Sequence, residues 1–135
     1  MAKTYEIPCA QTPKHASGVV SAANTNLDGT GTIVTLLTAG TDGAVISRVE
    51  FWGTVTSTAK RVNMFISQDA GSTWKLWDSG LMAAYTVANT TLQTVVKLID
   101  STAPDAARRV PASAVIGITT MVAEAVVCIA EYSDF

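Results

Sequence analysis

The chain has 135 residues, which is enough for one domain with a sizeable buried core. Hydrophobic residues make up 48% of the chain and charged residues only 15%, whereas an average soluble domain carries roughly 25% charged residues. The net charge of -2 argues against nucleic-acid binding, which requires clustered basic residues. The low charge indicates instead that partner subunits cover part of the surface.

We expect neither a secretion signal nor a membrane span. The N-terminus lacks the apolar core of a signal peptide. Residues 110–123 are uncharged, but this run is shorter than the roughly 18 residues that a spanning helix needs, so it predicts buried strands. Cys9 and Cys128 are far apart in the sequence. Without a secretion signal, this separation favours buried free thiols over a disulfide.

Residues 1–23 predict an extended N-terminal arm, and residues 24–135 a β-sandwich domain. In the arm, Tyr5 and Ile7 alternate with polar neighbours before two prolines interrupt the pattern. Such a segment fits either an edge strand of its own domain or a contact with a neighbouring subunit. Tyr5 and Ile7 are therefore candidate interaction residues.

The domain begins with a dense turn cluster at residues 24–31, after which the β-branched residues 32–37 predict a strand. Residues 43–77 predict a central meander of strands. In its long first strand, one face carries Val45, Val49, Phe51 and Val55, and the other face carries Arg48, Glu50 and Thr54. Trp52 falls on the polar face, which makes it a candidate interface residue.

The rest of the meander continues the alternation. Val62, Met64 and Ile66 share one face, Asn63 and Ser67 share the other, and Trp74 and Leu76 extend the pattern beyond a tight turn. In residues 78–91 the alternation fails, because small and polar residues dominate. This stretch predicts a loop across the mouth of the sandwich, with at most a short strand at residues 85–87.

The C-terminal part predicts more strands. Residues 92–99 predict one strand, and residues 101–111 predict an irregular loop with at most one helical turn. Residues 115–121 and 124–132 predict two further strands, joined as a hairpin around residues 122–123. The sequence therefore predicts an all-β, antiparallel sandwich or jelly-roll-like fold of about eight strands, without a long helix.

One octet matches the Asp-box pattern, with Ser67, Asp69, Gly71, Thr73 and Trp74 at its fixed positions. The octet resembles the repeat of sialidases and other glycan-active propellers, where it recurs in each blade. Here it occurs once, in a chain too short for a propeller. We interpret it as a structural turn in which Asp69 accepts hydrogen bonds from turn amides and Gly71 supplies an unusual backbone angle. A glycan-related role is the alternative.

Asn24, Asn26, Asp28 and Gly29 resemble the first half of a calcium-binding loop. An EF-hand needs a bidentate Glu at its twelfth position, where this chain has Thr35. Asn and Asp also favour turns through hydrogen bonds from their own side chains. We therefore interpret the motif as a structural turn, with calcium binding as the alternative.

No catalytic centre is visible, and we expect the chain not to be an enzyme. His15 is the sole histidine and lies in the arm without an evident partner, so neither a Ser-His-Asp nor a Cys-His mechanism has support. The sequence has no metal-spaced Cys/His set and no phosphate loop, so we expect no cofactor. Trp52, Trp74 and Trp77 could form a carbohydrate platform, although aromatic residues on strands are more often core or interface.

Four stretches carry a family resemblance. Residues 24–36, residues 39–49, the hairpin of residues 65–77 and the C-terminal stretch 110–135 resemble small virion structural proteins of tailed bacteriophages. The resemblance covers residues 24–135 and leaves the arm unmatched. It implies a capsid decoration, or cement, protein that binds the lattice of the phage major capsid protein.

The resemblance also implies a homo-oligomer, with a trimer preferred, on the capsid surface of a virion assembled in the bacterial cytoplasm. It implies neither a nucleic-acid nor a membrane partner. The alternatives are a tail, fibre or baseplate module of the virion and a glycan-binding module.

Overall fold

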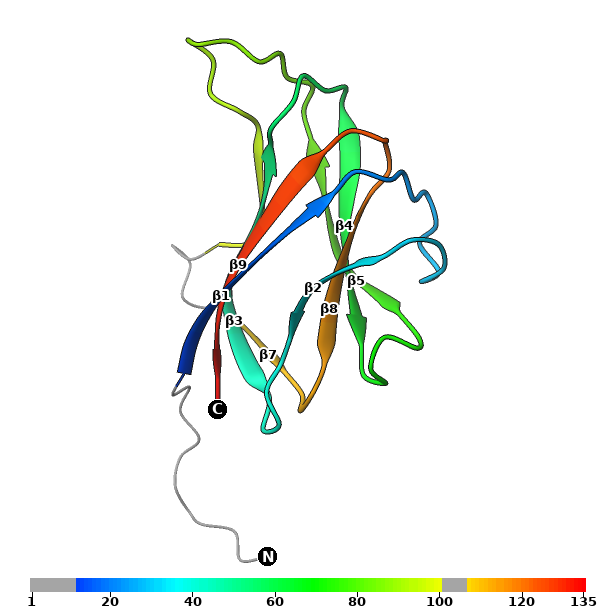
Figure 1. The fold of residues 1–135 in the computed structure, drawn as a ribbon, viewed down its shortest axis with the longest axis vertical. Helices are drawn as coiled ribbons and strands as arrows, with labels where there is room; N and C mark the ends of the chain where they lie inside the picture. The colour runs from blue at the N-terminus through cyan, green and yellow to red at the C-terminus, as the bar shows by residue number, and fades with distance from the viewer. Residues whose placement is uncertain (1–11, 101–106) are drawn as a thin grey trace, which may run out of the picture.

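A computed structural model describes residues 12–100 and 107–135, and these residues form a sandwich of two antiparallel β-sheets (Figure 1). The predicted all-β sandwich is therefore confirmed. The strands are β1 (Thr12–Val20), β2 (Val34–Thr38), β3 (Ala44–Gly53), β4 (Lys60–Ser67), β5 (Lys75–Met82), β6 (Val95–Ile99), β7 (Arg108–Val110), β8 (Val115–Thr120) and β9 (Val126–Asp134). Within the described ranges, no helix is long and apolar enough to cross a membrane.

The first sheet has the strand order β1-β9-β3-β6, and β7 also pairs with β3. The second sheet has the order β2-β8-β4-β5. At the two sides of the sandwich β1 contacts β2 and β5 contacts β6, so the sheets approach each other along both edges. Such closure shields part of the edge strands, which would otherwise offer unpaired backbone groups to other chains.

The core lies between the two sheets and is built from alternate residues of the central strands. Its largest fully buried members include Ile46 and Phe51 of β3, Met64 of β4, and Ile116 and Ile118 of β8. Each side chain of this kind contributes roughly 1.5–3 kcal/mol when it leaves water. This burial positions the outer faces of both sheets.

A β-bulge corrects the predicted faces of β3. The register between β3 and β9 shifts between Ile46 and Arg48, so that Ser47 is an extra residue. As a result Ala44 and Ile46, before the bulge, face the core together with Val49 and Phe51, after it. In an uninterrupted strand the first pair would face away from the second pair. The expectation that Val45 shares the face of Val49 and Phe51 is therefore wrong.

Three predictions for the second half of the chain are also wrong. Residues 78–82 belong to β5, and Gly80 lies there because an added Cβ would come within 2.5 Å of Val96 Cγ1. The last two strands do not form a hairpin, because β8 lies in the second sheet and β9 in the first. The connection around residues 122–123 crosses from one sheet to the other, and residues 108–110, expected in a loop, form β7.

Part of the predicted arm is an edge strand of the sandwich. Thr12–Val20 pairs along its whole length with β9. An ion pair between Lys14 and Asp134 links the N-terminal end of this strand to the C-terminal end of β9. The edge-strand alternative thus holds for this part of residues 1–23. Tyr5, Ile7 and Cys9 lie outside the described residues. Cys128 is a buried free cysteine, and burial raises the pKa of its thiol far above the usual value.

Candidate interaction surfaces

The outer face of the second sheet carries the loop of residues 24–33, which is closed by its own side chains. Asn24 donates to the carbonyl oxygens of Thr30 and Thr32, each at 3.0 Å, and accepts from the amide of Asn26. Asp28 Oδ1 accepts from both the amide and the hydroxyl of Thr30. These hydrogen bonds hold the pKa of Asp28 below its usual value. Asn24 Oδ1 and Asp28 Oδ1 of the calcium-like motif are therefore engaged in turn contacts.

The Asp-box octet forms the β4–β5 turn. Asp69 accepts from the amide of Thr73 at 2.8 Å, from the hydroxyl of Thr73 at 2.5 Å and from the hydroxyl of Ser67 at 2.7 Å. These hydrogen bonds, those from Thr73 first, lower the pKa of Asp69 to about 2. Gly71 has a φ of 87°, and its amide donates to Ser67 Oγ. The octet thus makes the turn contacts expected of a structural device.

The two turn motifs, which are far apart in the sequence, pack against each other. An added Cβ on Gly29 (φ 90°) would lie 2.1 Å from the carbonyl oxygen of Trp74. An added Cβ on Gly117 of β8 would lie 2.4 Å from Ile33 and 2.8 Å from the ring of Trp74. Trp74 and Ile33 therefore cover the middle of this outer face. Under them Phe65, which points away from the main core, is fully buried.

The outer face of the first sheet lacks such a cover among the described residues. Strand register places Val19 of β1 opposite Val127 of β9, Val127 opposite Trp52 of β3, and Trp52 opposite Val95 of β6. We call these four residues the apolar row. Val19 is 58% exposed, and the other three are half-buried. The sequence pointed to Trp52 alone, because the other three become neighbours only through strand pairing.

A charged network lies beside the apolar row on the same face. Arg48 donates to Glu50 at 2.7 Å and to Glu131 at 3.0 Å, and the indole nitrogen of Trp52 donates to Glu50 at 3.1 Å. The hydrogen bond from Arg48 outweighs burial and holds the pKa of Glu50 below its usual value. Glu50 in turn fixes the orientation of the Trp52 ring, so this ring is preorganised for contact.

Above both sheets rises a projection formed by the β3–β4 connection, residues 54–59, and the β5–β6 connection, residues 83–94 (Figure 1, top). We call it the tip. Neither segment contains a charged residue. Leu92 is 90% exposed, Val87 53% and Val55 39%. The tip is thus an uncharged and partly apolar part of the surface, which the sequence alone did not single out.

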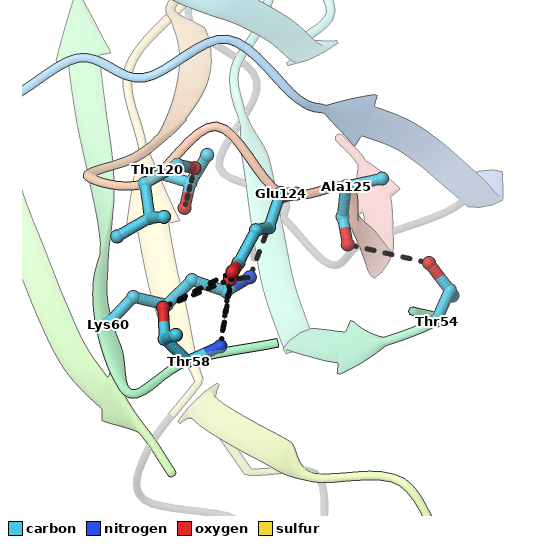
Figure 2. A network of polar contacts seen from close by, with 7 residues as sticks. Thr54, Thr58, Lys60, Thr120, Glu124 and Ala125 are labelled. Atoms are coloured by element: carbon cyan, nitrogen blue, oxygen red, sulfur yellow. Dashed lines mark hydrogen bonds and ion pairs between the residues drawn. The ribbon is translucent and has the colours of Figure 1, made fainter. Parts of the chain in front are cut away.

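The tip is held internally and at its base. Ser57 and Tyr85 exchange two backbone hydrogen bonds of 2.8 and 2.9 Å, which join its two segments. Figure 2 shows the base, where the carboxylate of Glu124 accepts from Thr58 and from the ammonium group of Lys60 at 3.1 Å. The Lys60 side chain is fully buried. Burial opposes the Glu124 charge, but hydrogen bonds from Thr58 and Lys60 outweigh it and lower the pKa of Glu124.

The remaining candidates from the sequence do not converge. Trp52 lies on the outer face of the first sheet, Trp77 packs against the core with Arg108 5.2 Å from its ring, and Trp74 lies over the second sheet. A shared carbohydrate platform is therefore wrong. His15 lies on β1 opposite Glu131. The described part of the chain contains no group of three or more His, Cys, Asp or Glu side chains suited to a metal ion.

Comparisons with known proteins find little. No family model matches the chain, and no curated protein matches it. Among solved structures, the chain has a likeness to a chain of the virus-like particle of the Macrobrachium rosenbergii extra small virus, from the giant freshwater prawn. The TM-score is 0.37 and the identity 9%, over 99% of this chain and 87% of that chain. A likeness at this level carries no conclusion about fold or function.

Proposed function

We propose that this chain is a structural protein of a bacteriophage virion that decorates the head and binds the lattice of the major capsid protein. The observation that carries the proposal is the uncovered apolar row on the first sheet. The motif resemblance of residues 24–135 to phage virion proteins points to the same class.

The apolar row has the features of a docking surface. It joins four adjacent strands, so it is flat and rigid, and it contains an aromatic ring oriented by Glu50. Buried aromatic anchors surrounded by apolar neighbours carry most of the free energy in protein interfaces. The charged network of Arg48, Glu50 and Glu131 lies beside the row, where a polar rim would lie. Mechanical reinforcement would follow from burial of roughly 800 Å² on each partner, repeated over many copies.

Tyr5 and Ile7 are proposed as further capsid contacts. Deleting residues 1–22 would remove β1, an edge strand that pairs along its full length with β9. A chain that lacks only residues 1–11 keeps the sheet and should bind capsids more weakly. If this shorter chain binds as the full chain does, the two side chains have no docking role.

Cryo-electron microscopy of the phage particles tests the proposal. We expect density for this sandwich on the outer surface of the head, repeated with the capsid lattice, with the first sheet facing the major capsid protein. A matched particle that lacks the gene should lose this density and release its DNA at a lower temperature. Density confined to the tail, a fibre or the baseplate would overturn decoration and favour the alternative virion module.

A glycan array provides the second arm of the test. The three tryptophans lie in three separate environments, and we therefore expect no glycan to bind. Specific binding that is lost in Trp74→Ala would overturn the interpretation of the Asp-box as a structural turn only.

A further inference from the structure

We propose that the ion pair between Lys60 and Glu124 keeps the tip closed on the sandwich, and that neutralising Glu124 opens the tip while both sheets stay folded. We call this ion pair the latch. The inference goes beyond the proposed function and concerns the purified chain. It can therefore fail while decoration stands, and decoration can fail while the latch stands.

The latch joins the tip to a connection that is distant in the sequence. Glu124 lies in the β8–β9 connection, and its carboxylate accepts from the amide and the hydroxyl of Thr58 and from the ammonium group of Lys60, at 3.1 to 3.2 Å. Figure 2 shows these contacts meeting at the one carboxylate. The neighbouring hydrogen bond from Thr54 to the carbonyl oxygen of Ala125 is longer, at 3.5 Å, and correspondingly weaker.

The tip contributes nothing to the interior of the sandwich. No residue of its two segments belongs to the hydrophobic core that the described residues form. The segments are joined to each other by the backbone pair of Ser57 and Tyr85 and by the hydrogen bond from the Val87 amide to Thr56 Oγ. A two-stranded unit of this kind is marginally stable by itself in water, and regions with few buried apolar contacts open first. Order in the tip therefore depends on its attachment at the base.

The latch depends on charge because Lys60 is buried. The Lys60 side chain is fully buried, whereas the Glu124 side chain is 22% exposed. An ammonium group inside a protein is costly unless a counter-charge binds it, and Glu124 is the carboxylate that Lys60 binds. Loss of this negative charge leaves the ammonium group unpaired. Opening of the tip then relieves the cost, because it gives the ammonium group access to water.

Glu124 is the group in this network that titrates in acid. The two segments of the tip contain no charged residue, and their Tyr85 is a phenol, which is neutral in acid. Residues 115–123, which form β8 and lead to Glu124, carry no charge either. On β4, Arg61 follows Lys60 and keeps its charge in acid. On β5, the residue opposite Lys60 is Met82.

The latch opens in acid rather than in base. Burial opposes the charge of Glu124, but hydrogen bonds from Thr58 and Lys60 outweigh it and hold the pKa of Glu124 below its usual value of 4.5. A carboxylate with a lowered pKa stabilises the closed form fully above the usual pKa, and this contribution is lost as the pH falls through the lowered value. The tip is therefore closed at neutral pH and opens below pH 4.5.

Hydrogen exchange of the purified full chain, followed by NMR, tests the inference. At neutral pH the amides of Ser57 and Tyr85 should be protected in the wild type and should exchange nearly as fast as an unstructured peptide in Glu124→Gln. The amides of β4 and β8 should stay protected by roughly 1000-fold or more, because both sheets remain folded. Glu131→Gln, which removes a carboxylate from Arg48 on the first sheet, is the matched control and should leave the tip protected.

Two further measurements separate charge from shape. Acid should remove the protection of the wild-type tip below pH 4.5 while the sheets stay protected, and this arm decides even if Glu124→Gln fails to fold. Lys60→Met/Glu124→Gln, which removes both charges, should keep the tip protected at neutral pH and in acid.

Three results would overturn the latch. In the first, Glu124→Gln leaves the protection of the tip within about twofold of the wild type. In the second, tip and sheets lose protection together, in Glu124→Gln or in acid, so that the chain opens as one unit. In the third, Lys60→Met/Glu124→Gln opens as Glu124→Gln does, which would exclude the buried charge as the cause.

Discussion

The outer faces of both sheets carry apolar side chains, but only one of these faces is covered by other described parts of the chain. On the second sheet, two turn motifs fold back and cover the strands, so that Phe65 is fully buried on the side away from the main core. On the first sheet, apolar side chains of four strands form a row without such a cover among the described residues, and Val19 is 58% exposed. A sheet face that the chain itself covers contributes to folding, whereas an uncovered apolar face is available for a partner.

The polar contacts on the two faces differ in the same sense. Around the covered face, Asp69, Asp28 and Asn24 bind backbone groups of their own loops, so they define the shape of the cover. On the open face, Arg48 and Glu50 orient the ring of Trp52 toward the surface. Substitutions on the covered face should therefore affect stability, and substitutions on the open face should affect binding.

The largest expected effect is from Gly29→Ala. The added Cβ would overlap the carbonyl oxygen of Trp74 at 2.1 Å, in a residue with a φ of 90°. Both the overlap and the left-handed backbone oppose a side chain, so we expect a loss of about 3 kcal/mol in the free energy of unfolding. Urea unfolding followed by tryptophan fluorescence measures this loss.

Gly18→Ala on β1 is the matched control for that variant. There an added Cβ would meet Ile118 at 3.6 Å, which is an ordinary contact. Its free energy of unfolding should change by less than about 1 kcal/mol. Equal losses in both variants would mean that the two turn motifs do not pack together as a cover.

The next effect concerns the ion pair that links the second sheet to the β8–β9 connection. Glu124→Gln leaves the Lys60 ammonium group, which is fully buried, without a counter-charge. Lys60→Met removes that charge and leaves Glu124, which is 22% exposed, in contact with water. We expect Glu124→Gln to lower the melting temperature by several degrees and Lys60→Met to lower it less. Differential scanning calorimetry decides, and the reverse order would contradict the pairing.

The sequence predicted the covered face better than the open face, for a physical reason. The motifs around Asp28 and Asp69 consist of contacts within a few residues, so their spacing along the chain reveals the turns. The packing of Gly29 on Trp74, and the row of Val19, Val127 and Val95 around Trp52, arise only from strand order and register. Register in turn depends on bulges such as the one at Ser47, and no local pattern in the sequence of β3 predicts that bulge.

Other errors have the same origin. Residues 78–82 were predicted as a loop because Ser79 and Gly80 have low strand propensity, but Gly80 is needed for the close approach of Val96 on β6. The hairpin predicted around residues 122–123 fails because two consecutive strands can pair in different sheets of a sandwich. Alternation identifies strands, but it does not assign them to a sheet.

Acid should weaken the β4–β5 turn on the covered face. The folded-state pKa of Asp69 is about 2, below its usual value of 3.8, so its carboxylate stabilises the fold fully above pH 3.8. This stabilisation is lost as the pH falls from 3.8 toward 2. We expect the melting temperature to fall over this window, and Asp69→Asn should fall less steeply there while starting lower at neutral pH. Parallel curves for the two proteins would remove Asp69 from the acid response.

The smallest expected effect on stability, and the sharpest contrast with Gly29→Ala, is from Val19→Glu on the open face. Val19 is 58% exposed at the end of an edge strand, so the free energy of unfolding should change by less than about 0.5 kcal/mol. In cosedimentation with capsids that lack the protein, the same variant should bind at least about tenfold more weakly, because docking would bury an unpaired carboxylate. Gln68→Glu, in the exposed β4–β5 turn of the second sheet, adds the same single negative charge away from the row and should bind nearly normally. If Val19→Glu binds like the wild type, the row is not the docking surface; if it unfolds the chain, the row contributes to the core after all.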